Sequence, residues 1–146
     1  MKTFTPDNSD AMAKAIFDAF GPFSNLGLEQ AVFATAEDTS EAYDGGSWTF
    51  ATNDDGTIGF WYPNDSPAYS VACQNYYEHP AMPATAFGAA CTLVAFNQLI
   101  WMLHQRNVGS DIVDLASDHY HRLRNWIFNL ADEEQLDGTA VAGFID

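Results

Sequence analysis

Two amphipathic helices are predicted at the start of the chain by the spacing of hydrophobic positions. Hydrophobic residues recur there at intervals of three or four, the period of one helix face. Gly21-Pro22 interrupts the pattern, so we expect one helix over residues 10–20 and a second after it, capped by Ser24 or Asn25. The two stripes consist of Met12, Ile16, Phe17 and Phe20, and of Leu28, Val32 and Ala36.

The pattern then changes to aromatic, β-favouring runs over residues 47–51 and 57–62. Asn53-Asp54-Asp55-Gly56 separates them, which is typical of a hairpin turn. A further turn at residues 63–67 leads into residues 69–73, which we expect to add a third antiparallel strand. The sequence therefore predicts a small antiparallel meander of three to four strands that buries its aromatic side chains under helices.

Residues 81–103 contain no charged side chain and are long enough to cross a bilayer. Four polar side chains interrupt this segment, and such groups are costly in hydrocarbon. Pro83 suits the first turn of a helix. We therefore favour a central core helix over a membrane helix and expect no membrane association. The four polar residues are Thr85, Thr92, Asn97 and Gln98.

A long final helix is expected after Ser110, which can cap it, and should pack antiparallel to the central helix. Its apolar stripe comprises Ile112, Leu115, Leu123, Trp126, Ile127 and Leu130. Residues 132–146 are acidic at first and apolar at the end, so they either dock or fray, and residues 1–9 are also candidates for flexibility. The expectation is one compact α+β domain over residues 1–146, with about four helices packed against the meander.

Composition agrees with a folded domain and restricts the choice of partner. The 146 residues are 47% hydrophobic and 17% charged, with five Lys and Arg against twenty Asp and Glu, a net charge of -15. Such a charge repels the phosphate backbone, so we expect no direct contact with nucleic acid. The opening residues lack the apolar run of an export signal. We therefore expect a cytoplasmic protein in which Cys73 and Cys91 are reduced.

No catalytic, metal or cofactor site is predicted. His119 and His121 are two residues apart on the final helix, so they point about 200° apart and cannot bind one metal together. His119 suits a hydrogen-bonded core position, and Cys91 suits a buried hydrophobic one. Asp44-Gly45-Gly46 lacks the spacing and the lysine of a phosphate-binding loop. A hydrolase or metal enzyme would require Cys91, His79, His104 or His119 to converge in one open cleft.

The final helix carries two of the five basic residues. Asp118 and Arg122 are four positions apart and can form an ion pair, while Arg124 projects from another side. Two interpretations stay open: a solvated ion pair, or basic groups that order a partner surface or tie the helix to Asp44 or Glu41.

Several motifs, taken in order, resemble the ArdB/KlcA family of antirestriction proteins. The most specific is Tyr43-Asp44-Gly45-Gly46-Ser47-Trp48-Thr49-Phe50. It is preceded by Glu29-Gln30-Ala31-Val32-Phe33 and followed by Gly59-Phe60-Trp61-Tyr62-Pro63. Ala86-Phe87-Gly88 and His119-Tyr120-His121-Arg122-Leu123-Arg124 continue the likeness, which spans residues 17–128.

The resemblance implies an α+β protein of plasmids, phages or integrated elements that relieves type I restriction of incoming DNA. It implies binding to a host protein, either the restriction–modification complex or an associated factor, and not catalysis. A general acidic interaction protein or DNA mimic is the alternative, and the chain is expected to be a monomer or weak dimer. The expected interaction surface comprises Tyr43, Asp44, Trp48, Asp118, Tyr120, Arg122 and Arg124. The chain departs from the family pattern at residues 75–80 and in its longer acidic N-terminus.

Overall fold

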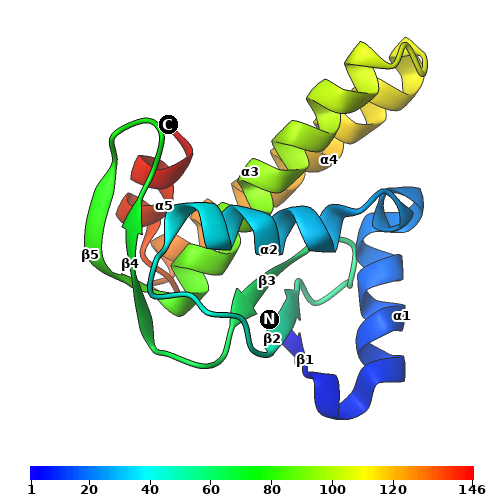
Figure 1. The fold of residues 1–146 in the computed structure, drawn as a ribbon. Helices are drawn as coiled ribbons and strands as arrows, with labels where there is room; N and C mark the ends of the chain where they lie inside the picture. Colours follow the sequence, from blue (N-terminus) through cyan, green and yellow to red (C-terminus); the bar gives the residue numbers. More distant parts are fainter.

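The computed structural model describes all residues from 1 to 146 and has the α+β fold expected from the sequence. Five helices surround two small antiparallel sheets (Figure 1). The helices are α1 (Ser9–Phe20), α2 (Leu28–Thr39), α3 (Ala84–Gln105), α4 (Ser110–Asp132) and α5 (Gly138–Ile145), with short 3-10 turns η1 (Pro6–Asn8) and η2 (Gly21–Asn25). The strands are β1 (Lys2–Phe4), β2 (Trp48–Thr52), β3 (Gly59–Pro63), β4 (Ala68–Ala72) and β5 (Glu78–Pro83).

The expected hairpin is confirmed as β2 and β3, which pair antiparallel with Phe50 opposite Trp61. The prediction that the next strand extends this meander is wrong. β4 instead pairs with β5 in a separate two-stranded sheet, and the free edge of β2 is occupied by β1, with Phe4 opposite Phe50. Neither β1 nor β5 was predicted.

Helix α3 occupies the edge of β3 where a further strand would otherwise pair. The backbone N–H of Trp61 donates to Thr92 Oγ1 at 3.2 Å, and Thr92 in turn donates to the carbonyl of Gly88 at 2.8 Å. A Cβ atom at position 88 would overlap the carbonyl oxygen of Trp61. The absence of a side chain at Gly88 therefore lets the helix backbone approach the strand directly.

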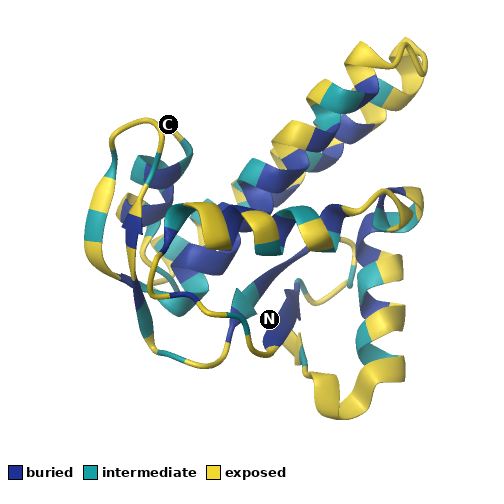
Figure 2. Cartoon of the chain, viewed as in Figure 1, coloured by how far each residue is buried: buried dark blue, intermediate teal, exposed yellow.

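The core lies where α1, α2 and α3 meet the three-stranded sheet (Figure 2). Phe20 at the end of α1 stacks on Trp61 with ring centroids 5.3 Å apart, and Phe50 packs against Trp61 at 4.8 Å. Because these aromatic side chains are removed from water, their burial is the main stabilising contribution of this layer.

Helices α3 and α4 form the expected antiparallel pair, and their outer halves project from the body as an arm (Figure 1). Both predicted caps are wrong. The N-caps are Gly27 for α2 and Gly109 for α4, both at positive φ. Ser24 instead donates to the carbonyl of Gly21 within η2, and Ser110 is the first residue of α4.

By length and composition α3 could cross a membrane, but 67% of its most apolar window is buried inside the protein. That burial is the property of a core helix.

The C-terminal residues dock on the body. Asp137 caps α5 by accepting from the backbone N–H of Ala140 at 3.0 Å, and Val141 and Phe144 are buried. Asn75 Nδ2, in the turn between β4 and β5, donates to the carbonyl of Gly143 at 3.1 Å. Residues 74–77, at the start of the stretch that departs from the family pattern, therefore help to hold the last helix in place.

Candidate interaction surface

Tyr43 and Trp48, two of the expected surface residues, are buried side chains of the core. Trp48 Nε1 donates to the Tyr43 hydroxyl at 3.0 Å, and the Trp48 ring lies 5.0 Å from Phe33 and 5.6 Å from Tyr43. Burial raises the pKa of Tyr43, while the hydrogen bond from Trp48 acts in the opposite direction. These two side chains anchor the segment that enters β2 and are not accessible to a partner.

Asp44 lies on the exposed bend between these two aromatic residues. Gly45 and Gly46 both have φ of +100°, a conformation that glycine adopts without steric cost. A Cβ atom at position 46 would also overlap the carboxylate of Asp65. The glycines of the motif are thus explained by backbone geometry, and Asp44 is the accessible member of this group.

The expected ion pair between Asp118 and Arg122 is absent, and neither Arg122 nor Arg124 is tied to Asp44 or Glu41. The Arg122 guanidinium instead lies 3.5 Å from His119 Nδ1, and Arg124 lies over the ring of Phe128 at 4.9 Å. Asp118 is exposed without a basic partner. Local contacts within α4 therefore hold both arginines.

His119 is buried among phenylalanine rings, as expected, with 6% of its surface exposed. The expected hydrogen bonding is incomplete, because its Nε2 has no partner. Its ring centroid lies 5.2 Å from Phe96, 5.3 Å from Phe20 and 6.2 Å from Phe23. Burial, and secondarily the Arg122 charge, lower its pKa to about 4. The imidazole is therefore neutral at pH 7, and its Nδ1 can accept a hydrogen bond from Arg122.

Tyr120 is half-buried on α4, and no hydrogen bond engages its hydroxyl. Burial raises its pKa, which the nearby Arg124 charge opposes. Tyr43, Asp44 and Trp48 lie on the segment that enters β2, whereas the remaining predicted residues lie on α4. No hydrogen bond or ion pair joins the two groups.

The potential nucleophiles and ligands do not come together. Cys91 is fully enclosed in α3, and burial raises its pKa well above its usual value. His79 accepts from the backbone N–H of Ala81 at 3.0 Å, while His104 and His121 are exposed. No group of three or more His, Cys, Asp or Glu side chains is arranged to hold a metal ion.

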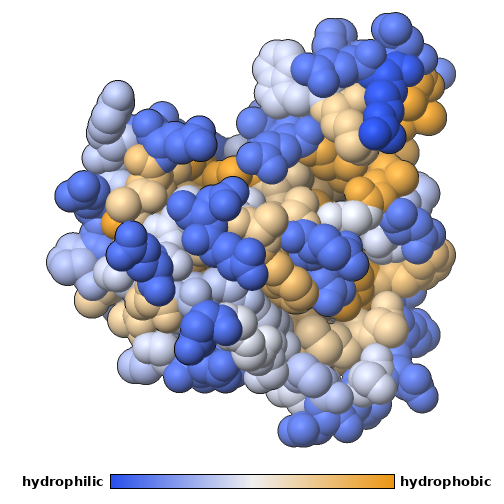
Figure 3. All heavy atoms as spheres, in the orientation of Figure 1, coloured by the Kyte–Doolittle hydropathy of each residue, from blue (hydrophilic) through white to orange (hydrophobic).

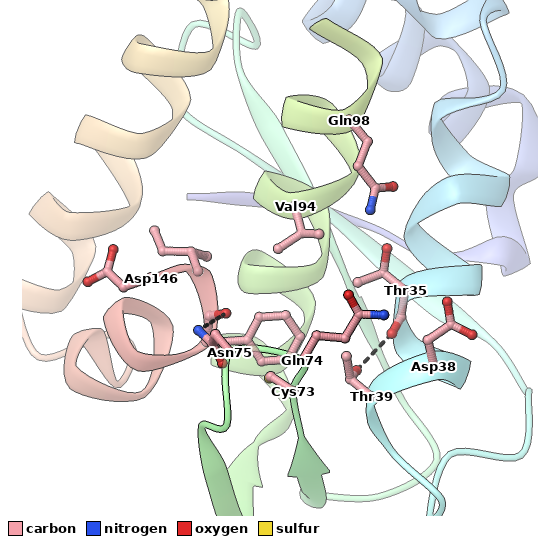
Figure 4. A pocket seen from close by; sticks show the side chains of 11 residues that line it. Thr35, Asp38, Thr39, Cys73, Gln74, Asn75, Val94, Gln98 and Asp146 are labelled. Atoms are coloured by element: carbon pink, nitrogen blue, oxygen red, sulfur yellow. Dashed lines mark hydrogen bonds between the residues drawn. The ribbon is translucent and has the colours of Figure 1, made fainter. Parts of the chain in front are cut away.

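A cleft that the sequence did not indicate lies between α2, α3, α5 and the turn after β4 (Figure 4). Its volume is about 230 Å³. Hydroxyl and amide groups dominate its polar wall, and Thr39 donates within α2 to the carbonyl of Thr35 at 2.7 Å. Burial raises the pKa of Cys73 at its base, so this thiol is protonated at neutral pH. The cleft offers hydrogen bonds and no activated nucleophile.

Most acidic side chains lie at the surface without neutralising partners. Every Asp and Glu except Glu29 is exposed. The only ion pair between side chains joins Lys14 to Asp18 at 2.6 Å, and the N-terminal ammonium group pairs with Asp54 at 3.4 Å. The uncompensated carboxylates are spread over helices, turns and both ends of the chain and do not line a single groove.

A family model described as "Antirestriction protein" matches residues 41–136, well over half of the chain. The chain belongs to the antirestriction protein family. The matched region contains the Tyr43–Trp48 segment, strands β2 to β5, and the whole of α3 and α4. Helices α1, α2 and α5 lie outside it.

The fold matches that of a solved antirestriction protein structure. The two chains are 23% identical with a TM-score of 0.71, and the alignment covers 100% of this chain and 96% of the other. That structure comes from work on the KlcA and ArdB proteins, described as having a novel fold and antirestriction activity against type I DNA restriction systems in vivo but not in vitro. Together the two findings confirm the resemblance to ArdB/KlcA proteins. No curated protein matches the chain.

This antirestriction protein exposes several large hydrophobic residues on its arm, and two of them contradict the prediction for α4. Ile112 and Leu115 were expected in a buried stripe but are 44% and 53% exposed. Trp101 on α3 is 60% exposed. The stripe is buried only where α4 passes the body of the molecule, because its outer half extends beyond α1 and η2 (Figures 1 and 2).

Proposed function

We propose that this protein relieves type I restriction of incoming mobile-element DNA by binding a host protein in the cytoplasm. The observation that carries the proposal is the match to the antirestriction family over residues 41–136. The partner would be the restriction–modification complex itself or a host factor that acts on it.

Binding is favoured over catalysis by the placement of the reactive side chains. The Cys91 thiol is enclosed, and the histidines are dispersed over β5, α3 and α4. No hydrogen bond joins a Ser, Thr or Cys side chain to a histidine or carboxylate, not even at the arm tip, where His104, Ser110 and Asp114 line one hollow. Nucleophilic catalysis requires such a pair.

Direct binding to DNA is disfavoured by the exposed carboxylates and the net charge of -15. The same acidic exterior is the observation that favours the alternative, a DNA mimic occupying the DNA-binding cleft of its partner. Mimicry would require carboxylates aligned like phosphates along one face. Their spread over several helices and turns favours docking through a specific patch.

The proposal is tested by plating unmodified phage on cells that carry a type I restriction system, with and without expression of this chain. We expect expression to raise the plating efficiency by at least about tenfold. Modified phage and cells lacking the restriction system provide the controls. Unchanged plating of unmodified phage, with the protein present in soluble form, would contradict the proposal.

Two further measurements distinguish the partner and the mechanism. The purified chain added to purified type I enzyme should inhibit DNA cleavage only if the enzyme itself is the partner. A DNA mimic should compete with DNA for the enzyme, and its inhibition should weaken steeply with salt. Relief in cells without inhibition of the purified enzyme would identify a host factor as the partner.

A further inference from the structure

The outer half of the arm carries an apolar surface that no part of the chain covers. We propose that this surface is the docking site for a basic amphipathic helix of the host partner. The inference rests on the proposed function and identifies the surface and the chemistry of the partner.

The uncovered surface continues a core stripe of α4. Ile112, Leu115, His119 and Leu123 follow one another at intervals of three or four, so they share one helix face. The inner part of this face is buried, with His119 against Phe20 and Phe23. Ile112 and Leu115 extend the same face, and both are exposed. Figure 3 shows hydrophobic residues along the side of the arm above α1 and η2.

Two hollows adjoin other parts of the arm, and neither is lined by Ile112 or Leu115. One, of about 280 Å³, lies between Leu26 at the end of η2 and Leu99 and Met102 on α3. The other, of about 430 Å³, lies at the tip of the arm and is lined by Val108 and Val113 among others. The exposed strip itself therefore consists of Ile112 and Leu115 on α4. Single exposed apolar residues are ordinary, but apolar residues that continue a core stripe beyond the body form a patch, and such patches mark sites for another molecule.

The charges beside the stripe define the chemistry of that molecule. Asp111 and Asp118 lie four residues before and three residues after Leu115, so both adjoin it on the helix surface. Both are exposed and have no basic partner, and Arg122 is held at His119. An apolar strip beside unpaired carboxylates is complementary to a helix that carries Lys or Arg next to its apolar face.

A second copy of this chain is a poor occupant. Each copy carries a net charge of -15, and two arms packed face to face would bring Asp111 and Asp118 of each copy toward like charges. Arg106 at the arm tip is the one basic side chain available to oppose them. The charge distribution therefore favours a basic partner over self-association.

The arm is also a better candidate than the cleft of Figure 4. The arm lies wholly within the region that matches the antirestriction family, whereas two walls of the cleft, α2 and α5, lie outside it. The cleft also presents mainly neutral amide and hydroxyl groups. The arm therefore lies in the family-matched region and also carries an exposed apolar strip beside carboxylates.

The test replaces the exposed apolar side chains by Gln in the full chain, as the double variant Ile112→Gln/Leu115→Gln. Glutamine preserves helix propensity and adds no charge. The matched control is Trp101→Gln, which removes a more exposed apolar group on the same arm. Trp101 is two residues from the buried Leu99 and Leu103, so it points about 200° away from them. Circular dichroism and thermal unfolding verify that all variants are folded.

In the phage-plating assay we expect the double variant to lose at least about tenfold of the relief, because the loss of apolar anchors weakens docking. The Trp101→Gln control should stay close to the unsubstituted protein. Full relief by the folded double variant would overturn the docking inference while leaving the proposed function intact. Absence of relief by the unsubstituted protein would instead contradict the proposed function.

Photo-crosslinking tests the surface independently of relief. A photoreactive phenylalanine analogue is placed at position 115, or at position 101 as the control, and the full chain is irradiated in cells that carry the restriction system. We expect a product specific to position 115, joined to a host-protein segment with Lys or Arg beside apolar residues at helical spacing. No product at 115, equal products at both positions, or a product containing a second copy of this chain would overturn the inference.

The contribution of the Asp111 and Asp118 carboxylates to binding is tested with a double variant and a matched control. Asp111→Asn/Asp118→Asn removes the carboxylates beside the stripe, and Asp55→Asn/Glu78→Gln makes the same change in net charge elsewhere on the surface. The arm variant should give a weaker crosslink at position 115, and the control should match the unsubstituted protein. An equal decrease for both pairs would mean that total charge, and not the arm surface, governs binding, which would overturn the inference.

Discussion

At the scale of single residues, His119 links the aromatic core to the pH dependence of stability. Its pKa is about 4 in the folded protein, compared with about 6.5 in an unfolded chain. The unfolded state therefore binds a proton below pH 6.5 that the folded state does not bind until about pH 4. The stabilisation is complete above pH 6.5 and is lost as the pH falls from 6.5 toward 4.

We predict that this residue contributes about 3 kcal/mol to the loss of unfolding free energy between pH 7 and pH 4. Urea titrations over this range should show a smaller loss for His119→Phe than for the unsubstituted protein. The difference between the two curves removes the contribution of the carboxylates, which both proteins share. Parallel curves would show that His119 titrates normally in the folded state.

The hydrogen bond between Trp48 and Tyr43 provides a second prediction at this scale. Tyr43→Phe leaves the buried Trp48 N–H without its acceptor at 3.0 Å, and an unpaired buried donor costs about 1–3 kcal/mol. We expect chemical denaturation to show a loss of that size. Tyr120→Phe is the control, because the Tyr120 hydroxyl has no hydrogen-bond partner and its loss should be close to neutral.

Those same residues show what could and could not be predicted from the sequence. The motif with Tyr43, the two glycines and Trp48 was the most specific part of the family resemblance, and the positive φ of both glycines explains their presence. It did not indicate which side chains face the core, because that depends on Phe33 and Tyr69 from distant segments. The ion pair expected for Asp118 and Arg122 failed for a similar reason. The buried His119 offers the arginine an alternative partner on the same helix.

At the scale of elements, periodicity predicted the long helices better than it predicted strand pairing. The stripe of α1 and the uncharged run of α3 are local properties of the sequence, whereas strand order depends on what occupies each sheet edge. β1 has only three residues, and β5 contains Pro80 and Pro83, so neither carries a strand pattern. The separation of β4 from β3 follows from the packing of α3 against Trp61.

Gly88 is the residue on which that packing depends. Alanine at this position would meet the backbone of Trp61 and Tyr62, neither of which can move without disrupting the sheet. We predict that Gly88→Ala destabilises the protein by about 1–3 kcal/mol or more, although alanine is normally the better helix former. Thermal unfolding should show a lower Tm.

Gly143→Ala is the matched control for this prediction. An added Cβ atom there meets only the ring of Tyr77, a half-buried side chain in the turn between β4 and β5. This ring can shift, so the substitution should cost less than Gly88→Ala. Equal or reversed effects would show that α3 does not need the close approach to β3.

At the scale of the whole molecule, the excess negative charge and the arm that extends from a compact body together place unpaired carboxylates beside exposed apolar surface. The body alone satisfies the requirement for a core, since α3 is buried where it passes the sheet. The arm adds exposed apolar surface with carboxylates beside it. The spacing of apolar residues predicted the whole stripe of α4, but it could not indicate where the body of the molecule ends. The exposure of Ile112 and Leu115 therefore depends on the tertiary arrangement.

The charge excess itself should be measurable as a salt dependence of stability. Only Lys14 among the basic side chains pairs with a carboxylate, so repulsion between acidic groups dominates the surface. Two like charges about 10 Å apart in water cost roughly 0.4 kcal/mol, and the folded chain holds many such pairs closer than the unfolded chain does. Screening should therefore stabilise the folded state.

We predict that the free energy of unfolding rises by about 1 kcal/mol or more between low salt and about 0.5 M NaCl, with a higher Tm. The variant Asp55→Asn/Glu78→Gln, with two fewer negative charges, should be more stable at low salt and show a shallower rise. A protein held together by surface ion pairs would show the opposite slope. Salt that stabilises the fold should also weaken capture of a basic partner, because screening reduces repulsion within the chain and attraction between the two molecules alike.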